Sequence, residues 1–84
     1  MDIHGKILHA FTAYDRKQQG KRGYNPYALG HYCKALESVD EAIASGQSPR
    51  EAIVANFVGR LLDVVLVGCG MAKATDDEHR YRRY

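Results

Sequence analysis

The segment 49–71 contains more apolar residues than one face of a helix can hold. Read at about 100° per residue, it places one apolar set on a broad face and a second set on the opposite side. A helix that is apolar all round is buried all round, and a chain of 84 residues has little left to cover the second face. The segment therefore predicts a helix that associates with another surface. The first set is Ile53, Val54, Phe57, Val58, Leu61, Val64, Val65 and Gly68, and the second set is Ala52, Ala55, Gly59, Leu62 and Leu66.

Capping signals predict where three helices begin. Asp2 is the expected N-cap of a first helix over 3–18. Asn25, followed by a proline, is the expected N-cap of a second helix. Ser48 is followed by a proline and, three residues on, by a glutamate. This capping box predicts that a third helix starts there and continues without a break to about residue 69.

Three helices joined by short loops predict an all-α fold. We expect a small three-helix bundle over residues 1–71 and a flexible charged C-terminal tail over 72–84, where the sequence is polar. The second and third helices are expected to be antiparallel neighbours, because Gly46 closes one just before the capping box opens the next.

Charge is distributed unevenly along the chain, although the formal net charge is only +2. Residues 1–24 have a net charge of +3, and residues 34–51 have a net charge of −2. The cations gather in and before the first loop, and the carboxylates lie along the second helix. We expect these segments to contact a protein partner. The expected contact residues are Arg16, Lys17, Lys21, Arg22 and Tyr24 on the basic side, and Glu37, Asp40 and Glu41 on the acidic side.

The sequence holds no recognisable catalytic, cofactor or metal motif. His31 and Cys33 are two apart on a helix, so their side chains diverge by about 200° and cannot chelate one ion. Nothing places Cys33 beside His4 or His9 as a nucleophile and base. Free cysteines are commonly buried, so we expect Cys33 and Cys69 to be structural. We therefore predict a protein that is not an enzyme and that uses no cofactor.

The second apolar face of the long helix predicts a homodimer. An apolar patch that the chain cannot cover indicates an interface, and a two-fold pair is the commonest arrangement. Small residues four apart would let another backbone approach closely. The expected dimer interface is Ala55, Gly59, Leu62 and Leu66.

Two alternatives for partner and compartment follow from the same residues. The basic loop 16–24, together with the cations and tyrosines of 80–84, can also bind nucleic acid by gripping phosphates and stacking bases. The apolar run 61–71 contains an aspartate and is too short to span a membrane. The first residues do not read as a signal peptide, so we expect a cytoplasmic protein without a membrane partner.

Three short stretches carry a resemblance. They are residues 24–30 (YNPYALG), 48–52 (SPREA) and 59–63 (GRLLD), with an acidic helix between the first two. Over about residues 20–70 the chain resembles small helical proteins of bacteriophages and mobile elements. The shared motifs are caps and core spacings. The resemblance implies an accessory protein that acts by stoichiometric protein–protein binding, in the style of host-directed inhibitors such as anti-CRISPR proteins.

Overall fold

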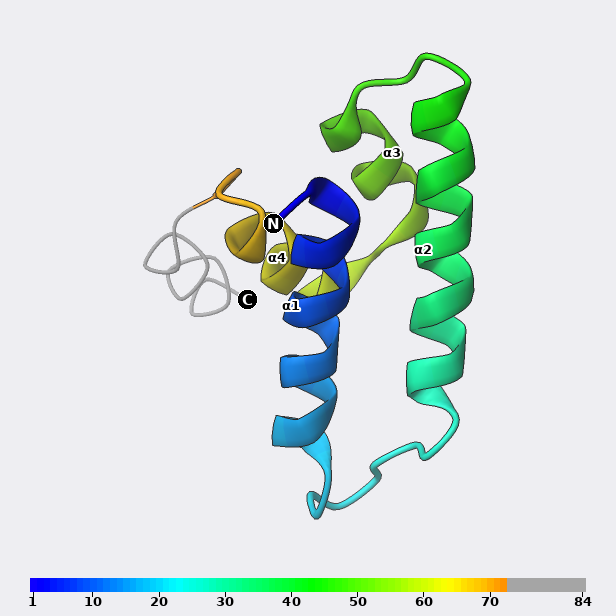
Figure 1. Cartoon of the computed structure of the whole chain (residues 1–84). Helices are drawn as coiled ribbons and strands as arrows, with labels where there is room; N and C mark the ends of the chain where they lie inside the picture. Colours follow the sequence, from blue (N-terminus) through cyan, green and yellow to red (C-terminus); the bar gives the residue numbers. More distant parts are fainter. Residues whose placement is uncertain (73–84) are drawn as a thin grey trace.

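Two long antiparallel helices form one side of the molecule (Figure 1). The computed structural model describes residues 1–72 of the chain. Helix α1 (Ile3–Gln18) starts at the expected cap, because the Asp2 carboxylate accepts a hydrogen bond from the Gly5 N–H at 2.8 Å. Helix α2 (Ala28–Ala44) starts slightly later than expected. The Asn25 side chain accepts from the Tyr27 N–H at 2.9 Å, and so caps a turn that precedes the helix.

Two short helices complete the fold. Helix α3 (Pro49–Asn56) packs against α2, and helix α4 (Gly59–Gly68) packs against α1. The Ser48 hydroxyl accepts from the Glu51 N–H at 3.2 Å, which confirms the capping signal at the start of α3. The described residues contain helices and no strand, so the all-α class is confirmed. The expected number of helices is wrong, because these residues form four helices and not three.

The uninterrupted third helix is replaced by a break between α3 and α4. The Asn56 side chain donates to the Ala52 carbonyl at 2.8 Å at the end of α3. Phe57 and Val58 then adopt extended backbone, and α4 begins at Gly59 with a φ of +62°. A straight helix over 49–69 would be about 30 Å long and would turn one of its apolar faces away from the other helices. The break lets both segments direct apolar residues into the same core.

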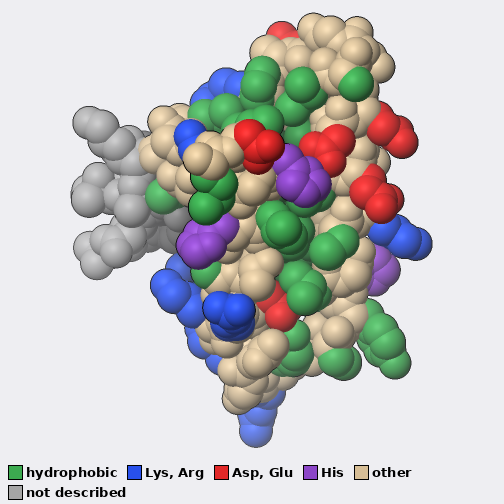
Figure 2. All heavy atoms as spheres, viewed as in Figure 1, with side chains coloured by type: hydrophobic (Ala, Val, Ile, Leu, Met, Phe, Trp, Pro, Cys, Tyr) green, Lys and Arg blue, Asp and Glu red, His purple; other side chains and the backbone are tan. Residues whose placement is uncertain are grey.

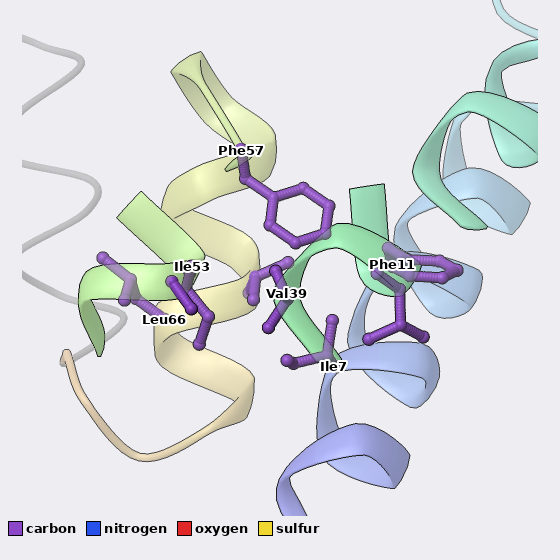
Figure 3. Packing of buried hydrophobic residues seen from close by; sticks show 9 residues of the cluster. Ile7, Phe11, Val39, Ile53, Phe57 and Leu66 are labelled. Atoms are coloured by element: carbon purple, nitrogen blue, oxygen red, sulfur yellow. The ribbon is translucent and has the colours of Figure 1, made fainter. Parts of the chain in front are cut away.

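The core draws on all four helices (Figure 3). The Phe57 side chain, from the link between α3 and α4, points toward the cluster, and its ring centroid lies 6.3 Å from that of Phe11. Burial of a side chain of this size contributes about 1.5–3 kcal/mol. The break is therefore stabilised by the ring that it places inside. The buried cluster is Ile7, Phe11, Leu36, Val39, Ala52, Ile53, Phe57, Val65 and Leu66.

Helices α1 and α4 approach each other closely at the end of α4. A Cβ atom built on Gly68 would lie only 2.6 Å from the Cβ atom of Ala10 in α1. The close backbone contact expected at Ala55 and Gly59 is thus found elsewhere. Gly59 has open space around its Cα and serves instead to provide a positive φ.

Two further expectations concern the C-terminal tail and the ability of a helix to span a membrane. The flexible tail expected over 72–84 lies, apart from Ala72, outside the described residues. Within residues 1–72, no helix combines the length and the apolar character needed to cross a bilayer.

Candidate binding surface

The expected basic residues lie together at one end of the molecule. Arg16 and Lys17 occupy the last turn of α1, and Lys21 and Arg22 lie in the loop that follows. All four side chains are exposed. We call the segment 16–24 the basic loop. In Figure 2, Lys and Arg side chains gather at the lower end of α1, whereas Asp and Glu side chains occupy the upper part of α2.

The basic loop is held to α1 by a buried carboxylate. The Tyr24 hydroxyl lies 3.0 Å from both carboxylate oxygens of Asp15, and the Gln19 amide donates to the same carboxylate at 3.3 Å. Asp15 is only 3% exposed. Backbone hydrogen bonds from Lys21 N–H to the Gln18 carbonyl and from Tyr24 N–H to the Lys21 carbonyl close two turns within the loop. The loop therefore has a defined shape.

A cavity of about 230 Å³ lies between the basic loop, α1 and α2. Its lining combines a carboxylate, phenol groups and cations. Burial raises the pKa of Tyr32, and the neighbouring Tyr14 and Asp15 raise it further. Burial also raises the pKa of Tyr24, and its hydrogen bond to Asp15 adds to the effect. The phenols of Tyr24 and Tyr32 are therefore neutral donors at physiological pH. The lining residues are Tyr14, Asp15, Gln18, Lys21, Arg22, Gly23, Tyr24, Asn25, Ala28 and Tyr32.

The expected acidic residues lie on α2, but they are not equivalent. Glu37 and Glu41 are exposed to solvent. Asp40 is partly buried, and its Oδ2 atom lies 2.8 Å from the Nδ1 atom of His4 on α1. This contact joins the two long helices near the start of α1. Glu37 and Glu41 are thus the more accessible part of the acidic face.

The residues expected at a dimer interface are separated by the break between α3 and α4. Leu66 is 5% exposed and packs in the core of its own chain, which takes it out of an exposed interface. Leu62 is partly buried against the same core. Ala55 and Gly59 are exposed. The apolar surface that a second copy can reach therefore differs from the expected one, because it does not include Leu66.

The two cysteines differ in exposure. Cys33 is exposed on α2, so the expectation that it is buried is wrong. Cys69 is partly buried, and burial raises the pKa of its thiol. Within residues 1–72, no three His, Cys, Asp or Glu side chains are grouped closely enough to hold a metal ion.

Asp15 is not among the site residues predicted from the sequence. A signal for it was present, because Asp15 follows Ile3, Ile7 and Phe11 at steps of four. That spacing places its carboxylate on the inner face of α1. The cavity itself had no comparable signal, since it needs Tyr32 of α2 to lie beside α1.

Comparison of the chain with protein-family models, with curated proteins and with solved structures finds no match.

Proposed function

We propose that this protein is a non-enzymatic accessory protein that binds an acidic segment of another protein through the basic loop. The observation that carries the proposal is the anchoring of this loop by the hydrogen bond from Tyr24 to Asp15. A solvated connection between two helices has no need of a buried carboxylate at its base. Four exposed cations on a loop of fixed shape form a surface suited to carboxylates.

Anchoring favours binding through entropy. A loop whose backbone must order when it meets its partner loses about 1–2 kcal/mol of conformational entropy for each residue that becomes fixed. Here the loop backbone is already ordered by its two turns and by Tyr24. The exposed cations raise the rate of association and make it depend on salt concentration. They raise the affinity less, because charges at the edge of an interface remain solvated. We therefore expect binding that weakens as the salt concentration rises.

The acidic face of α2 supports a directional mode of docking. Glu37 and Glu41 are exposed on the helix that leads away from the basic loop. A partner with separated acidic and basic patches would meet both surfaces in only one orientation. The resemblance to proteins of bacteriophages and mobile elements adds a partner class to the proposal, namely a component of a host defence system such as CRISPR.

Charge reversal tests the contact surface. The double variant Lys21→Glu and Arg22→Glu is compared with a control that reverses two exposed cations elsewhere, Lys6→Glu and Lys34→Glu. Each protein is immobilised and exposed to a host lysate at low and at moderate salt. We expect the loop variant to lose partners that the control retains. Retention of every partner by the loop variant would show that the loop is not the contact surface.

We also propose a homodimer, but through the exposed junction of α3 and α4 and without Leu66. Val58 is 80% exposed and Val54 is 48% exposed at the junction of α3 and α4, where Ala55 and Gly59 are also exposed. Light scattering of wild type, of Val58→Asp and of the control Leu8→Asp tests this. We expect only Val58→Asp to halve the molar mass. If the wild type has the molar mass of a monomer, the proposed homodimer is wrong.

A second candidate function is binding of single-stranded nucleic acid. It is favoured by the presence of tyrosines and cations around one cavity, since bases stack on aromatic rings and phosphates bind cations. The tail 80–84, which belongs to this alternative, lies outside the described residues. A gel shift with single-stranded oligonucleotides at two salt concentrations tests it. The absence of a shift at low salt eliminates this candidate.

A further inference from the structure

Asp15 is a buried carboxylate, and its side-chain hydrogen-bond donors within residues 1–72 are all neutral. It accepts from the hydroxyl of Tyr24 and from the side-chain amide of Gln19. Among residues 1–72, it has no ion-pair partner. Buried charges are ordinarily paired, and an ionised carboxylate has about four acceptor sites. Asp15 therefore retains the capacity to accept from a cationic donor.

This carboxylate lines the cavity beneath the basic loop, together with the phenol rings of Tyr14 and Tyr32. The face of an aromatic ring attracts a cation within about 6 Å of its centre. The cavity volume of about 230 Å³ is below the range of roughly 300–1,000 Å³ that is usual for small-molecule sites. The cavity thus fits one side chain better than a nucleotide or another complete metabolite.

We propose that the cavity receives one arginine side chain of the acidic partner segment. A guanidinium group is planar, stays charged, pairs with a carboxylate through two parallel N–H groups and stacks on aromatic rings. A lysine ammonium is more strongly hydrated and lacks the planar fork. The inference rests on the proposed function, because it assigns one residue of the partner that the basic loop binds.

Lys21 and Arg22 at the edge of the cavity determine what must flank that arginine. Both are exposed and line the cavity, so an incoming cation lies within the Debye length of about 8 Å and is repelled by them at physiological salt. Nearby carboxylates of the partner would neutralise them at contact. The recognised segment is therefore an arginine with acidic residues on either side.

The test uses two peptides and the full chain. One peptide has a central arginine between acidic residues, and the other has citrulline, the uncharged analogue of arginine, at the same position. Titration calorimetry measures both affinities. We expect the arginine peptide to bind about tenfold more tightly, which is the effect of one hydrogen-bonded ionic contact.

Two variants separate the cavity from the basic surface. Asp15→Asn keeps the shape of the side chain and can still accept from Tyr24, and it should bring the ratio of the two affinities close to one. The double variant Lys21→Ala and Arg22→Ala should weaken both peptides and leave the arginine preference in place. Equal affinities of the two peptides for wild type would overturn the arginine site while leaving the basic loop as the contact. A preference for arginine that survives Asp15→Asn would also overturn it.

A measurement on the wild type alone tests the arginine site even if the Asp15→Asn variant does not fold. N-acetylarginine amide and N-acetylcitrulline amide are titrated while the tyrosine ring signals are followed by NMR. Because these probes carry no acidic residues, they test the cavity without the docking step. We expect only the arginine probe to shift ring signals of Tyr14 and Tyr32. Equal shifts, or none from the arginine probe, overturn the arginine site, whereas failure of the acidic peptides alone overturns the proposed function.

Discussion

Replacing Gly68 by alanine tests the close packing of α1 and α4. The new Cβ atom would lie 2.6 Å from the Cβ atom of Ala10. Two carbon atoms in contact are normally about 3.5–4.0 Å apart. The two helices must therefore separate by about 1 Å at this point. Such a shift loosens the neighbouring core contacts of Phe11 and Val65, which belong to the same two helices.

Two effects of opposite sign set the size of the change. Replacing glycine by alanine in a helix normally stabilises it by about 1 kcal/mol. Overpacking of a tight contact costs about 1–3 kcal/mol. Because Gly68 is the last residue of α4, the helix gain is at the low end. We expect a net loss of about 1–2 kcal/mol in the free energy of unfolding, or a fall of about 5–15 °C in Tm for a domain of this size.

Thermal and urea unfolding followed by circular dichroism measure this change against two references. Gly30→Ala places a methyl group in open space on α2 and should raise stability. Ala10→Gly in the Gly68→Ala background removes one of the two clashing atoms and leaves the Cα atom of residue 10 at an ordinary 3.7 Å. A glycine inside α1 itself costs about 1 kcal/mol, so the double variant should lose less stability than the summed losses of Gly68→Ala and Ala10→Gly alone. The clash is refuted if Gly68→Ala is as stable as Gly30→Ala, or if the losses of the two single variants simply add.

Three further predictions follow from the structure. Iodoacetamide at pH 8 should modify the exposed Cys33 well before Cys69, whose pKa is raised by burial, and mass spectrometry of the digested protein would reveal equal rates if this is wrong. Alkaline pH should destabilise the fold, because the raised pKa values of Tyr24 and Tyr32 mean that the folded state keeps protons that the unfolded state releases. Their contribution is complete below the unfolded pKa of about 10 and is lost as the pH rises through the folded values. If the urea concentration at the unfolding midpoint is as high at pH 11 as at pH 9, this prediction is wrong. Gly59→Ala should cost about 1–2 kcal/mol, because the φ of +62° disfavours a Cβ atom, and an unchanged urea midpoint would exclude this.

The local signals in the sequence located the starts of α1 and α3, whereas the N-cap expected at Asn25 is wrong, because the N-cap of α2 is Tyr27. Asp2 and Ser48 both cap helices, because a cap depends on residues that are three apart and needs no distant partner. The break after Asn56 was missed because Phe57 continues the apolar spacing of the helix. Its decisive cause is tertiary, since the Phe57 ring packs beside Phe11, which is 46 positions earlier in the sequence.

The candidate site was predicted only in its charged part. The cations of the basic loop are contiguous enough in sequence to be seen as one surface. The Asp15 carboxylate beneath them was not recognised. Its part in the site depends on a tertiary contact, because Tyr24 must fold back over α1 to donate to it. Tyr32 joins the same cavity from α2, and nothing in the spacing of Tyr14 and Tyr32 indicates that the two helices align there.

The pairing of α1 with α4 has a consequence for how the chain reaches its folded state. The first helix of the described region buries its inner face against the last, and α3 and α4 have only 8 and 10 residues. Isolated helices of that length are marginal in water. In a nascent chain emerging from the ribosome, α2 can cover part of Ile7 and Phe11, but the part that α4 covers stays exposed until residues 59–68 arrive. We therefore expect a fragment lacking α4 to expose the inner face of α1 and to be less stable than the full chain.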